Sequence, residues 1–248
     1  MLRVVLGQEY DVLGVETWLA EPERAHERPV LLLRHDVDQH PGSALRMAAI
    51  ETDLGLRSTW YFRWRTAQPR VIRAIQDGGH TVGLHYETLT RIALERGLRP
   101  EQTGELIDEA RELLAYELTA FSDRFGPARS TCPHGDTRMP RVNNGVLLRG
   151  EDLASYGIEW DANEALGRRG VDVWLTDRSS AEGRWRDAID PVDLLIDRRS
   201  PLLLIVHPNN WVSGPALWWD RLVPGGIRTG SDEPRLAQFE SQRGLFST

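Results

Sequence analysis

Five side chains that can bind a metal ion or transfer a proton stand at the ends of four apolar segments. Asp36 and Asp38 follow VLLLRH, His85 ends HTVGLH, His134 follows ARSTCP, and His207 ends PLLLIVH. If these segments are parallel strands, their carboxyl ends meet at one edge of the sheet, where α/β proteins bind ligands. Carboxylate oxygens and imidazole nitrogens together suit zinc or another first-row divalent ion with an open position for water. The pattern predicts a hydrolytic metal site.

The aspartate pair ends the most apolar segment, residues 30–38. Because side chains alternate along a strand, Asp36 and Asp38 should point to the same side while Val37 packs away from them. Two converging carboxylates predict a cation. The segment alone leaves open a second reading, a polar turn in which Asp36 caps His40 and Asp38 is solvated.

Strand and helix patterns alternate from residue 30 onward. Apolar or β-branched runs predict strands, and helical spacing between Pro and Gly signals predicts the segments that connect them. The predicted strands are 30–38, 58–64 and 80–85, and the helices between them are 41–55 and 69–79. This order is typical of right-handed βαβ units in a parallel sheet.

The second half continues with shorter signals. A helix is predicted over 100–118, followed by strands at 128–131, 158–160, 171–175 and 201–207. About seven strands favour an α/β fold, an incomplete or irregular (β/α) barrel. We predict a single domain over residues 1–248, with 1–27 as a lead-in and 221–248 as a tail, both of undetermined form.

Composition narrows the classes of partner. The net charge is −7, so there is no overall basic field for nucleic acid or an anionic membrane. All 30 basic residues are arginines, so no single arginine is assigned a function by its type. With one cysteine, Cys132, no internal disulfide is possible. No apolar run approaches the length of a membrane span or a signal peptide, so we expect a cytoplasmic protein.

These motifs resemble those of the polysaccharide deacetylases of the NodB-homology type, which are metal-dependent (β/α) barrel hydrolases. The resemblance covers about residues 30–211. RHDVD is similar to the family's aspartate pair, which implies that Asp38 is a metal ligand and Asp36 the catalytic base. GGHTVGLHYETL is similar to the family's histidine segment, which implies that His85 is the second ligand.

Two further motifs carry the resemblance into the second half of the chain. LLLIVHP is similar to the strand that ends in the catalytic acid, a role that falls to His207. Residues 173–177 are placed like the strand whose polar end orients that histidine, which implies Asp177. CPHG resembles a loop that approaches the metal in the family.

The sequence also departs from the family pattern. Leu89 stands where a second ligand histidine should fall, and the aspartates are spaced Asp-x-Asp instead of being adjacent. The combination of HDVD, GLHYE and PHG is similar to the WbmS-like group, deacetylase-like proteins found with surface-polysaccharide biosynthesis genes. We predict His134 as the third ligand, ahead of Glu87.

The resemblance implies a divalent metal, expected to be zinc, and N-deacetylation of an N-acetylated sugar or polysaccharide precursor. We expect His35, Glu87, Trp64 and Trp211 to contact the substrate, with core packing as the alternative for the tryptophans. Two other functions stay open: a barrel that binds a glycan or nucleotide-sugar without hydrolysing it, and a hydrolase of a small non-sugar amide. The sequence does not define the oligomeric state.

Overall fold

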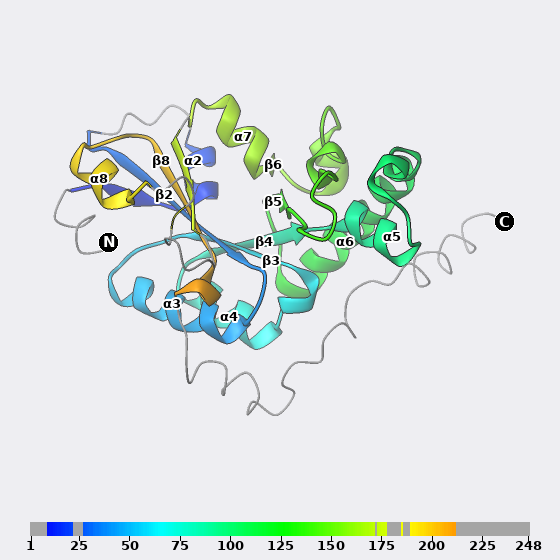
Figure 1. Ribbon diagram of the computed structural model, residues 1–248. Coiled ribbons are helices and arrows are strands. Elements are labelled where there is room, and N and C mark those ends of the chain that lie inside the picture. Colours follow the sequence, from blue (N-terminus) through cyan, green and yellow to red (C-terminus); the bar gives the residue numbers. More distant parts are fainter. Residues whose placement is uncertain (1–8, 22–26, 172, 178–184, 186–188, 212–248) are drawn as a thin grey trace.

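The computed structural model describes residues 9–21, 27–171, 173–177, 185 and 189–211 (Figure 1). The predicted tail at 221–248 and part of the predicted lead-in lie outside these residues. Among the described helices, none is long and apolar enough to cross a membrane.

One curled parallel sheet organises the molecule. Seven strands pair in the order β6-β5-β4-β3-β2-β8-β7, and β1 pairs with the first half of β2. Their bounds are β1 Asp11–Leu13, β2 Val30–Val37, β3 Thr59–Phe62, β4 Thr81–Tyr86, β5 Ser130–Pro133, β6 Trp160–Asp161, β7 Val173–Thr176 and β8 Leu202–Val206. No pairing joins β6 to β7 within the described chain, so the barrel is open. This confirms the predicted incomplete (β/α) barrel with about seven parallel strands.

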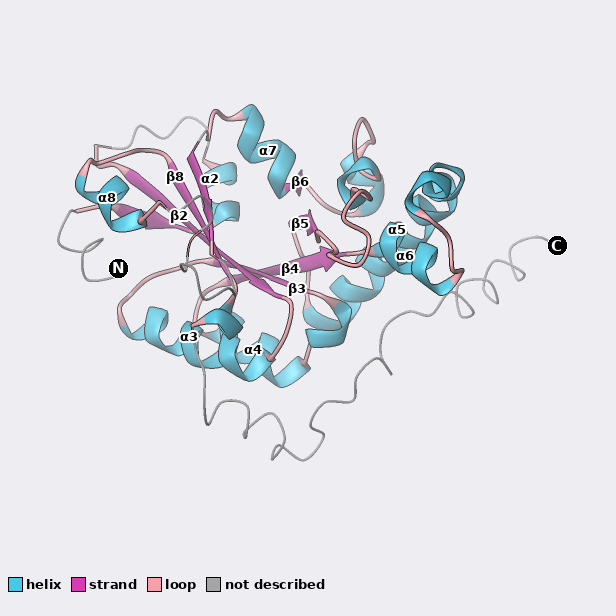
Figure 2. Cartoon of the chain, in the orientation of Figure 1, coloured by secondary structure: helices cyan, strands magenta, loops and turns pink. Residues whose placement is uncertain are grey.

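Helices cover both sides of the sheet, as Figure 2 shows. On one side α3 (Pro41–Asp53), α4 (Pro69–Asp77) and α6 (Ile107–Phe125) enclose the largest core cluster. On the other, α2 (Val15–Ala20) and α7 (Ala162–Arg168) pack over β2 and β5. Because β2 is covered on both faces, all eight of its residues are buried. The other described α-helices are α5 (Thr88–Glu95) and α8 (Pro191–Ile196), and the 3-10 segment η2 (Pro100–Leu106) precedes α6.

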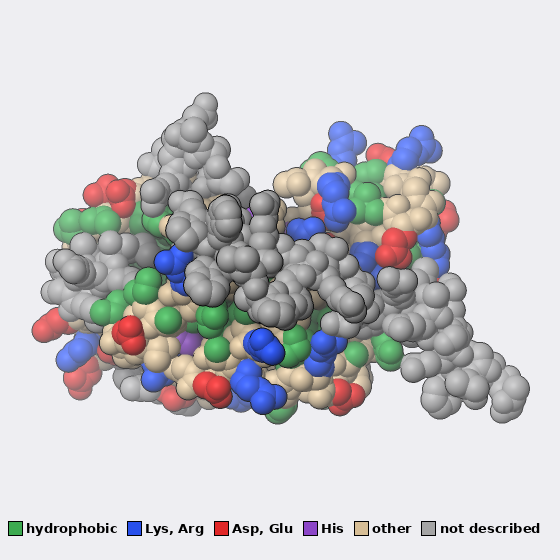
Figure 3. Space-filling view, turned by 90° about the horizontal axis from the view of Figure 1, so that it is seen from below, with side chains coloured by type: hydrophobic (Ala, Val, Ile, Leu, Met, Phe, Trp, Pro, Cys, Tyr) green, Lys and Arg blue, Asp and Glu red, His purple; other side chains and the backbone are tan. Residues whose placement is uncertain are grey.

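The outer surface beside α3 and α4 is mixed in character. Figure 3 shows hydrophobic side chains there among arginines and acidic residues. Leu45 and Ile50 of α3, and Leu54 directly after it, are exposed to solvent. Charges of both signs are interspersed on this side instead of forming a patch of one sign.

The helix predicted over 100–118 differs from the structure. Its first part is the 3-10 segment η2, and α6 continues to Phe125 because Phe121 and Phe125 extend the buried stripe. Helix α5 was not predicted, since its TLTR start contains two β-branched threonines and interrupts the apolar periodicity.

A glycine fixes the approach of β5 to β4. A Cβ at Gly83 would lie 2.2 Å from the carbonyl oxygen of Ser130, closer than atoms can approach. Glycine therefore lets the two strands pair with His85 opposite Cys132. This register places His134, two residues further on, beside His85.

Candidate metal centre

Three predicted ligands meet at the carboxyl edge of the sheet. Asp38 follows β2, His85 belongs to β4, and His134 follows β5. His85 Nε2 lies 3.6 Å from Asp38 Oδ1, and His134 Nε2 lies 3.4 Å from Asp38 Oδ2. One ligand atom from each residue fits within 4.8 Å of the others, so the three can hold a metal ion together.

The state of these groups fits a divalent cation. Asp38 Oδ1 is buried without a hydrogen-bond partner, which is costly unless a ligand satisfies it. Burial raises the pKa of Asp38, but the hydrogen bond from His134 and the nearby imidazoles lower it by more. The net pKa lies below its ordinary value, so the carboxylate is ionised. Burial lowers the pKa of His85 to about 4, against the opposing charges of Asp36 and Asp38. An ionised carboxylate and a neutral imidazole are the forms that bind metal.

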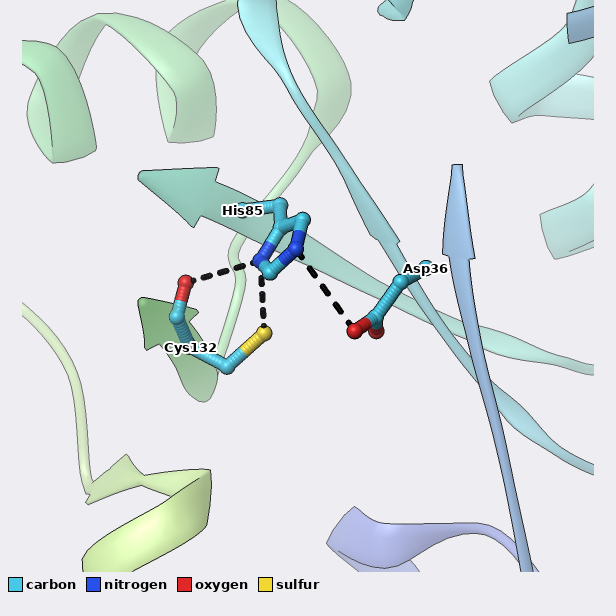
Figure 4. Close-up of side chains that lie close together, drawn as sticks. All are labelled: Asp36, His85 and Cys132. Carbon is cyan, nitrogen blue, oxygen red and sulfur yellow. Dashed lines mark hydrogen bonds and ion pairs between the residues drawn. The ribbon is translucent and has the colours of Figure 1, made fainter. Parts of the chain in front are cut away.

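Two neighbouring groups have similar composition but less freedom to bind a cation. Figure 4 shows Asp36, His85 and Cys132 together. Both oxygens of Asp36 accept hydrogen bonds from Arg34, and burial raises the pKa of the Cys132 thiol well above its ordinary value. A thiol binds metal as thiolate, so this group is a poor ligand set.

The second such group is Glu87, His134 and Asp136. Arg63 binds both carboxylate oxygens of Glu87, and Arg138 binds both of Asp136. In these three groups, Asp38 is the carboxylate that no arginine side chain occupies.

The backbone and neighbouring side chains orient both histidines. His85 Nδ1 lies 3.1 Å from the Cys132 carbonyl oxygen and 3.0 Å from its Sγ (Figure 4). These contacts leave Nε2 to face the carboxylates of Asp36 and Asp38. The backbone N–H of His134 donates to the Tyr86 carbonyl at 2.8 Å. His134 Nδ1 faces Glu87 Oε2 at 3.8 Å. Such outer contacts set the orientation of metal-binding imidazoles.

The predicted base, Asp36, faces the same ring nitrogen of His85 as Asp38 does. Asp36 Oδ2 is 3.5 Å from His85 Nε2, and Arg34 Nε and Nη2 each donate to the Asp36 carboxylate at 2.8 Å. Burial raises the pKa of Asp36, but the charges of Arg34 and His85 lower it by more. The net pKa lies below its ordinary value, so Asp36 is an ionised proton acceptor. Arg34 was not predicted. Its position two residues before Asp36 was a usable signal, because alternation puts both on one face of β2.

His207, which follows β8, faces the Asp38 carboxylate. Its Nε2 lies 3.6 Å from Asp38 Oδ2, and its Nδ1 lies 2.6 Å from Asp177 Oδ1. Trp211 Nε1 donates to Asp177 Oδ2 at 2.6 Å. Burial lowers the pKa of His207, but the Asp177 hydrogen bond and the charges of Asp36 and Asp38 raise it to about 9. His207 thus carries a proton at neutral pH.

The expected substrate contacts are placed differently. His35 is buried on the opposite face of β2, against Glu51 and Trp60, because it is one residue out of phase with Asp36. Trp64 is buried against Phe121 and Phe125. Neither residue lines the cavity at the candidate site.

The other two expected substrate contacts, Glu87 and Trp211, are not among the residues that line the cavity either. Glu87 lies behind His134, bound to Arg63, and Trp211 contacts Asp177. Leu89, at the place of the family's second histidine, is buried in the core.

An open cavity of about 930 Å³ gives access to the centre. Its lining includes the proposed ligands Asp38 and His134 and the proposed acid pair His207 and Asp177. Charged and amide side chains complete it: Gln39, Arg63, Arg65, Asp136, Arg138, Asn209 and Asn210. A cavity of this size can admit a sugar residue.

No protein-family model matches the sequence, and comparison with curated proteins finds no match. Among solved structures, the chain is similar to a family 4 carbohydrate esterase from Streptomyces lividans in complex with acetate, at 16% identity over 75% of this chain and 83% of that chain, with a TM-score of 0.37. It is also similar to a family 4 carbohydrate esterase from Bacillus anthracis, at 14% identity over 88% and 80% of the two chains, with a TM-score of 0.42. A family 4 pseudoenzyme from Bacillus anthracis matches at 13% identity over 82% and 62%, with a TM-score of 0.38. Since these TM-scores lie below 0.5, the function must be inferred from the residues of the site itself.

Proposed function

We propose that this chain is a metal-dependent hydrolase of an amide C–N bond, acting on an N-acetylated sugar. The observation that carries the proposal is the arrangement around Asp38. Two imidazoles face its carboxylate, and an arginine-bound carboxylate and a carboxylate-bound histidine flank them. A cation site with a proton acceptor on one side and a proton donor on the other is what amide hydrolysis requires.

Asp38, His85 and His134 would hold the ion. A divalent cation bound there supplies Lewis-acid polarisation of the acyl carbonyl and a lowered pKa for water. Asp36 accepts the proton of the attacking water, since Arg34 keeps its carboxylate ionised and directed at His85. Arg34 is therefore a positioning residue for the base.

His207 donates a proton to the leaving amine. Asp177 holds its Nδ1, which leaves Nε2 directed toward Asp38 and the cavity. Trp211 fixes the second oxygen of Asp177, so the pair is held from two sides. Oriented general acids of this kind typically contribute about 10²- to 10⁴-fold to rate.

The test is release of acetate by purified, zinc-loaded protein. N-acetylglucosamine and its short oligomers form one substrate set, and small linear and cyclic amides form the other. We expect acetate from the sugars, abolished by Asp36→Asn. Hydrolysis confined to the small amides would transfer the proposal to a non-sugar substrate.

One observation favours a second candidate, a glycan-binding barrel without hydrolysis. Leu89 replaces a family ligand and is buried in the core. This candidate predicts that an N-acetylated sugar binds the zinc-loaded chain with no release of acetate over long incubation.

A further inference from the structure

Three guanidinium groups lie at the cavity, beside the carboxylates of Asp38, Asp136 and Asp177. Arg63, Arg65 and Arg138 all line it. Arg63 binds Glu87 through two hydrogen bonds, and Arg138 binds Asp136. Glu87 and Asp136 thus neutralise two of the three guanidinium groups.

Arg65 is the guanidinium left over. Its Nη2 donates to the backbone carbonyl of Asp38 at 3.1 Å. It makes no ion pair with any carboxylate in the described part of the chain, and its side chain is exposed at the cavity. An anionic group of a ligand in the cavity could therefore pair with this guanidinium.

The backbone around Arg65 holds its place. Arg65 lies in the short 3-10 segment η1 (Trp64–Thr66). The hydroxyl of Thr66 donates to the carbonyl of Val37 at 2.5 Å, which ties this segment to the end of β2. The guanidinium is therefore set beside the backbone of a proposed metal ligand.

We infer that the substrate carries an anionic group, a phosphate or a carboxylate, that Arg65 binds at the cavity wall. The inference rests on the proposed function, because it names the class of N-acetylated sugar that this same site takes. Guanidinium pairs with phosphate or carboxylate oxygens through planar, charge-assisted hydrogen bonds. The contact between Arg65 and the Asp38 backbone places the anion near the acyl group to be cleaved.

The first experiment compares three sugars: N-acetylglucosamine, its 6-phosphate and the corresponding N-acetylated uronic acid. We expect kcat/KM for one charged sugar to exceed that for the neutral sugar by about tenfold or more. Arg65→Gln should lower that charged-to-neutral ratio by about ten- to hundredfold. Arg70→Gln, an exposed arginine on α4 outside the cavity lining, is the matched control and should leave the ratio unchanged.

Which charged sugar responds identifies the anion as phosphate or carboxylate. Added salt should reduce the ratio in the original chain more than in Arg65→Gln, because it screens the charge interaction. Arg65→Lys should recover part of the ratio, since it restores the charge without the planar fork.

A binding experiment separates this inference from the proposed function. The same three sugars are titrated by calorimetry into zinc-loaded Asp36→Asn protein, alone and combined with Arg65→Gln or Arg70→Gln. Stronger binding of a charged sugar that Arg65→Gln abolishes and Arg70→Gln preserves supports the inference even if no sugar releases acetate, in which case only the proposed hydrolysis fails. Equal binding of the neutral and charged sugars, no binding of either charged sugar, or equal effects of the two variants would overturn it.

Discussion

Two clusters of histidine and carboxylate side chains lie on opposite faces of β2. They differ in how many of their polar atoms have hydrogen-bond partners within the protein. The cavity cluster is Asp38, His85 and His134, of which Asp38 and His134 line the open cavity. The core cluster is His35, Glu51, Ser58 and His80, and all four residues are fully or almost fully buried. Residues Asp36 and His35, adjacent in the sequence, belong to opposite sides because the strand alternates.

The core cluster satisfies most of its polar atoms internally. Glu51 accepts from Ser58 Oγ at 2.7 Å and pairs with His35 Nε2 at 2.8 Å. His80 Nδ1 contacts Ser58 Oγ at 2.9 Å, and its Nε2 contacts Thr52 Oγ1 at 3.0 Å. Only His35 Nδ1 lacks a partner among the ring nitrogens of this cluster. The short contacts leave no room for a cation between the groups.

In the cavity cluster the polar groups lie further apart, and one carboxylate oxygen has no hydrogen-bond partner. Its imidazole-to-carboxylate separations are 3.4 and 3.6 Å, longer than the corresponding core contact of 2.8 Å. Asp38 Oδ1 has no hydrogen-bond partner. The comparison teaches that residue types alone do not distinguish a ligand set from a structural network. What distinguishes the two clusters is a ligand atom without a hydrogen-bond partner in a residue that lines an open cavity, as at Asp38.

The largest expected effect is loss of the metal. Asp38→Ala and His85→Ala should each reduce bound zinc from about one ion per chain to none, because a hydrolytic site with two remaining protein ligands is incomplete. Zinc is measured by mass spectrometry after dialysis. His80→Ala, in the core cluster, is the control and should keep the zinc. Unchanged zinc in the Asp38 or His85 variant would remove the distinction between the clusters.

Next in size is the loss of turnover with the metal retained. Asp36→Asn and His207→Ala should each reduce kcat by about 10²-fold or more, since each removes a proton-transfer group. Zinc content should stay at the level of the unsubstituted chain. Full activity in both variants would contradict the assigned roles.

The core cluster should respond in stability instead of zinc content. Glu51→Ala should lower the free energy of unfolding by about 2–4 kcal/mol, because it leaves buried groups of His35 and Ser58 without their acceptor. Denaturant unfolding measures this change, with Glu51→Gln as the milder control. If folded Glu51→Ala protein lost its zinc, the two clusters would be coupled instead of separate.

A smaller effect is expected at Asp177. Asp177→Asn should lower kcat by about tenfold, because an amide still hydrogen-bonds His207 but does not stabilise its positive charge. Steady-state kinetics and the zinc content are measured together. A loss as large as that of His207→Ala would mean that Asp177 does more than orient the acid.

The smallest expected effect concerns pH and His80. Burial lowers the pKa of His80 from its ordinary 6.5, with Glu51 opposing and His35 and Arg57 adding to the shift. As pH falls below 6.5, the unfolded chain therefore binds this proton before the folded chain does, so stability is full above 6.5 and declines below it.

His80→Asn should reduce that decline by at most about 1.4 kcal/mol per pH unit, since one titrating group is removed. Chemical unfolding at pH 8, 6 and 5 measures the slope. The two proteins should show the same slope near pH 8, where neither state of His80 takes up a proton. Equal slopes at low pH would show that His80 does not titrate on unfolding.

The sequence by itself determined where most strands of the sheet lie along the chain and at which edge of the sheet the chemistry lies. Alternation in VLLLRHDVD placed Asp36 and Asp38 on one side of β2, where both lie within 3.6 Å of His85. Polar ends on separate strands predicted that Asp38, His85, His134 and His207 would come together, as they do. Both predictions rest on local features: side chains alternate along a strand with a period of two residues, and parallel strands end at the same edge of the sheet. Neither feature requires knowledge of how the rest of the chain packs.

Only the tertiary structure decided which neighbours each group acquired. His35 was expected at the substrate, but Glu51 of α3 packs over its face of the strand and buries it. Because every basic residue of the chain is arginine, residue type did not single out Arg34 or Arg65. Their surroundings in the structure did: Arg34 binds the Asp36 carboxylate, whereas Arg65 lines the cavity and donates to the Asp38 backbone. These partners come from separate elements, and their distances depend on how helices and loops pack against the sheet. No period in the sequence encodes that packing.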